Sequence, residues 1–221
     1  MLISHKNKFI SIDIPKTGTR SLRTALLPTG CIDICNDNPT QDVKGLFSHH
    51  GTASECRRGF NEKGWDFNEY FKFSIIRNPW LRYFSFFKYY FMKMNEFIDC
   101  EDISKMSKKE IHQSQICLDL FNNVKEYKDI MNIIVEENFS QNSFISDESG
   151  EVIVNKLLKF EDLDKEFKFL CNYVGIDPIP DLPHENKTPK TFSLKEVFSQ
   201  EAIDKVAVKE KSIIEKFGYS I

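Results

Sequence analysis

The residues with the clearest chemical potential stand close together, in the stretch Pro-Lys-Thr-Gly-Thr-Arg-Ser at positions 15–21. The stretch follows a run of alternating apolar residues, which is typical of a strand, and it precedes a helix-like segment. Backbone N–H groups at the start of a helix bind anions, and hydroxyl and guanidinium side chains add further donors. The sequence therefore predicts an anion-binding loop here. Its predicted binding residues are Pro15, Lys16, Thr17, Gly18, Thr19, Arg20 and Ser21.

The lysine of this loop stands in an unusual place. In a Walker A loop the lysine follows the last glycine, whereas Lys16 precedes Gly18. A lysine at the end of a strand can reach across the mouth of the turn and neutralise charge that develops on a leaving-group oxygen. The alternative interpretation is an exposed turn with a surface lysine.

A second segment, Ile-Arg-Asn-Pro-Trp-Leu-Arg-Tyr-Phe-Ser at positions 76–85, repeats the strand-turn-helix design. Arg77 closes an apolar strand, Pro79 suits the first position of a helix, and Ser85 lies two turns further on. A guanidinium grips a phosphate through two N–H groups, and a serine hydroxyl adds a donor. Two such sites on neighbouring strand ends suit a nucleoside with phosphates at both ends. Alternatively, Arg77 caps the helix or pairs with an acid, and Ser85 faces a crowded helix.

The elements that must position these residues alternate between strands and helices. Strands are expected over 8–14, over 31–35, at the start of 43–60 and up to Arg77, with a hairpin over 142–160. Helices are expected over 19–27, after Thr52, after Asn78, in two pieces over 104–138, over 163–174 and up to Gly218. Capping boxes mark two of the helix starts, Thr52 with Glu55 and Ser107 with Glu110. This order predicts an α/β, P-loop-like three-layer fold with a mainly parallel central sheet, in one domain over 1–221.

Composition excludes several classes of function. The net charge of −3 gives no general attraction to nucleic acid or to an anionic membrane. The six cysteines form no Cys-x-x-Cys pair and no zinc spacing, so no metal is expected. The N-terminus lacks the pattern of a signal peptide, and no apolar run is long enough to span a bilayer. We therefore expect a cytoplasmic protein with free thiols.

The motifs together resemble those of a known family. The stretch 15–21 resembles the 5′-phosphosulfate loop of sulfotransferases that use 3′-phosphoadenosine 5′-phosphosulfate (PAPS), and 76–85 resembles their 3′-phosphate motif. Residues 48–57 resemble the histidine segment of the carbohydrate sulfotransferase branch. Residues 157–176, 182–186 and 215–219 are similar to the C-terminal half of that branch. The resemblance thus runs along nearly the whole chain, in order.

The resemblance implies a PAPS-dependent transfer of a sulfuryl group to a hydroxyl acceptor, with a glycan as the expected acceptor and adenosine 3′,5′-bisphosphate (PAP) as the product. Lys16 would stabilise charge, Arg77 and Ser85 would hold the 3′-phosphate, and His50 would be the base, since its position matches the histidine of the branch. The chain departs from the branch at Thr19 and Arg20, where Gly-Thr is usual, and at Lys159, where arginine is common. These departures leave the chemistry intact but leave the identity of the acceptor open.

Other assignments stay open at this level. His49 is adjacent to His50, and His184 and Lys187 stand in a Pro-rich loop that could line the cleft. A P-loop nucleotide kinase is the first rival, although the position of the lysine and the lack of a Walker B-type acid argue against it. The second rival is a non-catalytic module that binds PAP.

Overall fold

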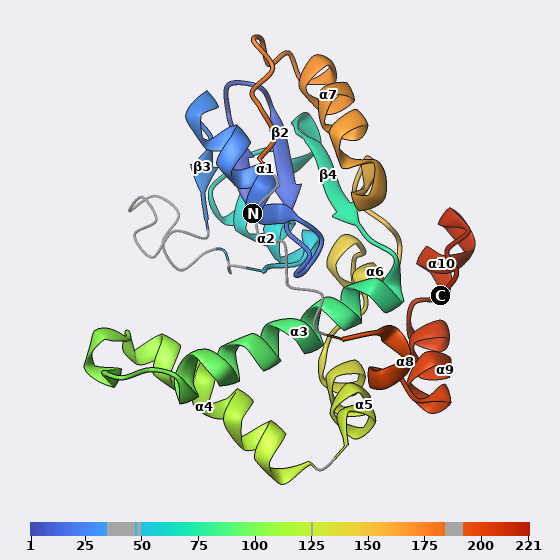
Figure 1. Cartoon of the computed structure of the whole chain (residues 1–221). Coiled ribbons are helices and arrows are strands. Elements are labelled where there is room, and N and C mark those ends of the chain that lie inside the picture. Colours follow the sequence, from blue (N-terminus) through green and yellow to red (C-terminus); the bar gives the residue numbers. More distant parts are fainter. Residues whose placement is uncertain (35–46, 48–49, 125, 184–191) are drawn as a thin grey trace. The chain divides into compact units, whose positions relative to one another are not determined.

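The computed structural model of the chain describes residues 1–34, 47, 50–124, 126–183 and 192–221 (Figure 1). The chain divides into two compact units. The first consists of Met1–Asn78 and Phe139–Asn186, and the second of Pro79–Asn138 and Lys187–Ile221. The single domain over 1–221 stays a prediction.

The first unit contains a sheet of five strands in the order β3-β1-β2-β4-β5. The strands are β1 (Leu2–Ser4), β2 (Phe9–Ile12), β3 (Ile32–Asp33), β4 (Phe71–Ile76) and β5 (Lys156–Lys159). The pairs β2–β4 and β4–β5 are parallel, whereas β1 is antiparallel to both β2 and β3. The predicted α/β fold with a mainly parallel sheet is confirmed, since four strands run one way and β1 alone runs the other.

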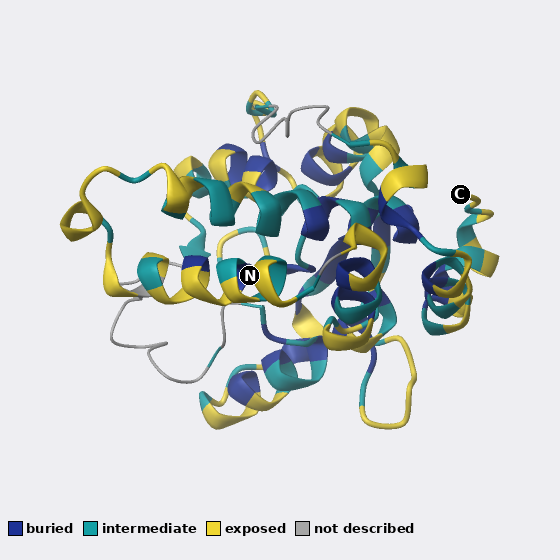
Figure 2. Cartoon of the chain, turned by 60° about the horizontal axis from the view of Figure 1, so that its bottom comes forward, coloured by how far each residue is buried: buried dark blue, intermediate teal, exposed yellow. Residues whose placement is uncertain are grey.

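Both faces of this sheet are covered. On one face Phe9, Phe73 and Leu158 join a core cluster with side chains of α1 (Thr19–Leu26) and α7 (Leu163–Tyr173). Alternate strand residues, such as Ile10 and Ile12, point to the opposite face and are also buried. Figure 2 shows helices that carry buried and exposed residues around the same axis, as expected for amphipathic helices on a sheet.

Local signals predicted the start of α2 (Ala53–Glu62) correctly. Thr52 Oγ1 accepts the N–H of Glu55 at 3.1 Å, and Glu55 Oε2 accepts the N–H of Thr52 at 2.8 Å. This reciprocal capping box satisfies two donors that the helix itself leaves unpaired. The cap, two residues after His50, fixes the start of the helix at Ala53.

Replacing Thr52 with alanine should lower the free energy of unfolding by about 1 kcal/mol, because the cap loses its acceptor for the Glu55 N–H. Thr52→Ser keeps the hydroxyl and should remain close to the wild type. Urea denaturation of the two variants and the wild type measures the difference. An alanine variant as stable as the serine variant would contradict the role of the cap.

The hairpin predicted over 142–160 is wrong in most of its length. Residues Gln141–Ile145 form the helix α6, and the only antiparallel pairing found in this segment is one bridge between Ser146 and Val152. The last part becomes β5, which pairs in parallel with β4. The short strand predicted at the start of 43–60 lies almost wholly outside the described residues, Phe47 being a bend.

The second unit is helical and rich in aromatic residues. Its helices are α3 (Pro79–Ile98), α4 (Lys108–Asn123), α5 (Tyr127–Glu137), α8 (Leu194–Val197), α9 (Gln200–Lys209) and α10 (Lys211–Phe217). Phe87 packs edge-on against Tyr127 and Phe192, with ring centroids 5.6 and 5.2 Å apart. A buried ion pair joins Arg82 and Glu210 at 3.2 Å. Among the helices that the structure describes, none combines the length and the apolar character that crossing a membrane requires.

Candidate functional site

The loop over residues 15–21 connects β2 to α1, as predicted. Lys16 and Gly18 both have positive φ, 69° and 84°, and Gly18 occupies the N-cap position of α1 without a side-chain cap. A non-glycine residue rarely adopts the conformation of Lys16, and such residues persist only where neighbouring contacts hold them. The helix start lacks acidic residues in its first turn. The loop therefore places the N–H groups of a helix start beside two basic residues, Lys16 and Arg20, which suits an anion.

The hydroxyl side chains of the loop do not share one role. Thr17 is fully buried, and its Oγ1 donates to the carbonyl of Ile14 at 2.9 Å. Its hydroxyl hydrogen therefore closes the turn and is not directed to a ligand. Thr19 is partly exposed, Arg20 is exposed, and Ser21 is 8% exposed.

Arg77 comes from the neighbouring strand end and reaches this loop. Its Nη1 donates to the carbonyl of Lys16 at 3.1 Å, and its Cζ lies 4.4 Å from the centroid of the Phe160 ring. Its Nε is buried without a hydrogen-bond partner in the part of the chain that the structure describes. Burial lowers the pKa of Arg77 from its high ordinary value, while Glu161 opposes that shift. A half-buried guanidinium beside a loop of this kind favours an anionic ligand.

The backbone around Arg77 is held by two side chains. Gln141, fully buried at the start of α6, accepts the N–H of Arg77 at 2.8 Å and donates to its carbonyl at 2.9 Å. Glu161 accepts the N–H of Asn78 at 2.8 Å. These contacts continue the hydrogen bonding of β4 past its last residue, and so they fix the point from which the Arg77 side chain extends.

His50 lies against the same end of β2. Its Nδ1 is 3.0 Å from the carbonyl oxygen of Asp13. A carbonyl oxygen only accepts, so Nδ1 carries the hydrogen and the lone pair of the neutral ring is on Nε2. Burial lowers the pKa of His50, although the hydrogen bond to Asp13 opposes the shift. The ring is thus held in the neutral tautomer that can accept a proton at Nε2.

The carboxylate of Asp13 anchors this end of the strand. Asp13 is 1% exposed and accepts from Ser11 Oγ at 2.6 Å and from Arg23 Nη2 at 2.8 Å. The amino group of Met1 lies 2.5 Å from its Oδ2. Burial alone would raise the pKa of Asp13, but the Met1 ammonium and Arg23 lower it. The charged carboxylate therefore fixes the backbone carbonyl to which His50 is bonded.

The loop, Arg77 and His50 thus meet at the carboxyl ends of β2 and β4, the edge where open α/β sheets bind their ligands. Comparison with known proteins agrees with this arrangement, since the family model described as the sulfotransferase family matches residues 1–212. The chain belongs to the sulfotransferase family. No curated protein and no solved structure matches it.

Membership of the sulfotransferase family makes the chain a transferase and confirms the family-level resemblance; the carbohydrate branch stays a prediction. The other predicted residues either belong to the second unit or lie outside the described residues. Ser85 is 8% exposed on α3, in the second unit. His49, His184 and Lys187 lie outside the described residues. His112 is exposed on α4.

The sequence patterns did not predict four residues of this candidate site: Asp13, Gln141, Phe160 and Glu161. Asp13 carried a usable signal, because a charged residue interrupts an apolar strand just before the loop. Phe160 and Glu161 follow β5, so a correct assignment of that strand would have placed them at the same edge. Gln141 carried no signal, since its role depends on contacts with a residue 64 positions away.

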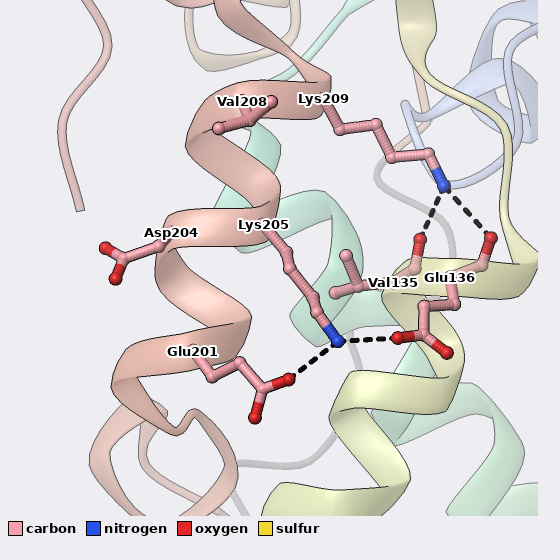
Figure 3. Close-up of a pocket in the computed structure, with 7 residues that line it drawn as sticks. All are labelled: Val135, Glu136, Glu201, Asp204, Lys205, Val208 and Lys209. Atoms are coloured by element: carbon pink, nitrogen blue, oxygen red, sulfur yellow. Dashed lines mark hydrogen bonds and ion pairs between the residues drawn. The ribbon is translucent and has the colours of Figure 1, made fainter.

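Figure 3 shows a hollow in the second unit. It has a volume of about 640 Å³ and is lined by Val135, Glu136, Glu201, Asp204, Lys205, Val208 and Lys209. Lys205 Nζ is 2.5 Å from Glu136 Oε1 and 2.8 Å from Glu201 Oε1, and Lys209 Nζ donates to the carbonyls of Val135 and Glu136 (Figure 3). The ammonium groups of Lys205 and Lys209 are thus both bonded to protein oxygens. Acidic residues, Glu136, Glu201 and Asp204, make up most of the rest of the lining. This hollow therefore does not suit a phosphorylated ligand.

Proposed function

We propose that the protein transfers a sulfuryl group from PAPS to a hydroxyl group of an acceptor, and that the acceptor is a carbohydrate. The observation that carries the proposal is that the loop over 15–21, the Arg77 guanidinium and the His50 ring lie at one sheet edge. The loop of Lys16 accepts a hydrogen bond from Arg77, and His50 is bonded three residues upstream of Lys16, at Asp13. We also propose that the protein is cytoplasmic. This location and the choice of a carbohydrate as acceptor rest on the sequence alone.

Each residue has a separate task in this proposal. PAPS supplies the sulfuryl group, whose bond to the 5′-phosphate oxygen breaks as a bond to the acceptor oxygen forms. The N–H groups at the start of α1 bind the 5′-phosphosulfate, and the Lys16 ammonium neutralises the charge left on the bridging oxygen. His50 takes the proton of the acceptor hydroxyl at Nε2. Arg77 binds the 3′-phosphate. That Ser85 is a further donor to this phosphate rests on the sequence alone.

The nucleotide site predicts a preference between two ligands. PAP should raise the melting temperature more than AMP at equal concentration, because the 3′-phosphate adds binding to the folded state. Arg77→Ala should remove most of the difference, whereas Arg58→Ala, which removes an exposed arginine of α2, should leave it intact. Thermal denaturation of the wild type and the two variants, each with PAP and with AMP, measures this difference in melting temperature.

The rival functions give different results in the same assay. Equal stabilisation by AMP and PAP would remove the case for a 3′-phosphate site. Stabilisation by ATP that requires magnesium would favour the nucleotide kinase. A preference for PAP without PAPS-dependent transfer to any acceptor, across glycans and small hydroxyl compounds, would favour the binding module.

A further inference from the structure

Phe160 contacts two parts of the candidate site, the loop at Gly18 and the Arg77 guanidinium, although the proposed chemistry gives it no task. It begins the short 3₁₀ helix η4 (Phe160–Asp162), which follows β5 directly. It is partly buried and packs against the core cluster that contains α1 and α7 side chains. Its ring contacts two of the elements that carry the predicted ligand-binding residues, the loop and the end of β4.

The first contact is with Gly18. A Cβ placed on Gly18 would lie 2.7 Å from Cε2 and 2.8 Å from Cδ2 of Phe160, which is closer than carbon atoms can approach. The backbone of the loop therefore rests directly on the ring. The positive φ of Gly18, 84°, independently favours glycine at this position.

The second contact is with Arg77. The Cζ of the guanidinium lies 4.4 Å from the ring centroid, within the range of a cation–π interaction. The same guanidinium donates through Nη1 to the carbonyl of Lys16, whose φ of 69° needs neighbouring contacts to hold it. Residues 16 and 18 of the loop are thus tied to Phe160, one through Arg77 and one directly.

We infer that Phe160 is a positioning residue, whose ring sets the loop and Arg77 at a fixed separation so that both ends of one nucleotide can be bound at once. The inference rests on the proposed function for its ligand, but the contacts themselves can be tested without any ligand. A purely structural role for Phe160 would affect stability alone.

The test replaces the ring with an aliphatic side chain. Phe160→Leu should lower kcat/KM for PAPS roughly 5- to 30-fold, the equivalent of about 1–2 kcal/mol for a desolvated cation–π contact. It should also reduce the preference for PAP over AMP. Phe160→Tyr keeps the ring and should recover most of both. If Phe160→Leu does not fold, Phe160→Met takes its place.

The matched control is Phe169→Leu. Phe169 is 47% exposed on α7, and Lys156 Nζ lies 5.0 Å from its ring centroid. The control therefore loses the same atoms and the same kind of cation–π contact, away from the loop. It should leave kcat/KM and the ligand preference unchanged.

A double-mutant comparison separates positioning from packing. If Phe160 acts through Arg77, Phe160→Leu should lower kcat/KM much less in the Arg77→Ala background than in the wild type. An equal loss in both backgrounds, or a lower melting temperature with an unchanged kcat/KM and PAP preference, would overturn the inference.

Hydrogen exchange of the ligand-free protein separates this inference from the proposed function. The backbone amides of residues 16–21 should exchange faster in Phe160→Leu than in the wild type or in Phe169→Leu, since the loop loses its support. Unchanged exchange would overturn the positioning role. Faster exchange in a protein that shows no preference for PAP would retain that role and reject the nucleotide.

Discussion

His50→Ala should lower kcat by about 10²–10⁴, the usual contribution of a positioned general base, and leave PAP binding nearly unchanged. The proposed acceptor hydroxyl must lose its proton, and His50 is held against Asp13 in the tautomer that accepts one at Nε2. The base acts on the acceptor, so it has no need to contact the nucleotide. Turnover on one working acceptor and a PAP titration measure the two effects.

Two further variants distinguish the base from a structural histidine. His50→Asn retains an N–H that can bond to the Asp13 carbonyl but has no basic nitrogen, so it should be as inactive as His50→Ala. His112→Ala, on the exposed surface of α4, should keep full activity. An active His50→Asn would show that the hydrogen bond to Asp13 is what matters. If His49→Ala is instead the inactive variant, the assignment is off by one residue.

The pH dependence follows from the environment of His50. The neutral ring is the active form, and burial disfavours the charged ring and so lowers its pKa. Activity should therefore fall with acidification only below the ordinary histidine pKa of about 6.5, and should be level above it. A pH–rate profile of kcat/KM tests this. A midpoint well above the ordinary value would contradict the effect of burial, and an unchanged profile in His50→Ala would place the base elsewhere.

Lys16→Ala should lower kcat by roughly 10²–10³, the loss that follows removal of a donor from developing negative charge. PAP binding should weaken far less, because the charge on the bridging oxygen develops during transfer. Steady-state kinetics with PAPS and a PAP titration give the two numbers. If PAP affinity falls as far as kcat/KM, Lys16 is a binding residue only.

The backbone of Lys16 requires its own control. Its φ of 69° is unfavourable for alanine but not for glycine, so Lys16→Gly removes the ammonium without adding strain. It should be as inactive as Lys16→Ala. Lys16→Arg keeps a positive charge and should retain more activity than either. A nearly active Lys16→Gly would mean that the loop conformation, and not the charge, limits the reaction.

The sequence by itself determined the elements whose signals are local. The capping boxes at Thr52 and Ser107 predicted the starts of α2 and α4, and glycines ended helices at Gly175 and Gly218, as the structure has them. Pro79 likewise begins α3. Such signals depend on backbone groups within four or five residues of each other, so they survive whatever the rest of the chain does.

The sequence also placed Lys16, Arg77 and His50 at ends of strands or starts of helices, which was enough to predict one site. The α/β alternation implies that these ends meet, because parallel strands share a carboxyl edge. The sequence pattern could not predict which atoms of these residues are in contact. Arg77 was expected to serve a phosphate, and in the structure it also holds the carbonyl of Lys16.

Only the tertiary structure decided the supports of the site. Gln141 bonds to Arg77 across 64 residues, Glu161 to Asn78 across 83, and His50 to Asp13 across 37. The same is true of β5, which was expected in a hairpin and instead pairs with β4, a strand some 80 residues earlier in the chain. A side chain's chemical type permits such contacts, but the path of the chain selects among many equivalent partners. The reactive residues are therefore readable from short patterns, whereas the residues that hold them in place follow from long-range packing.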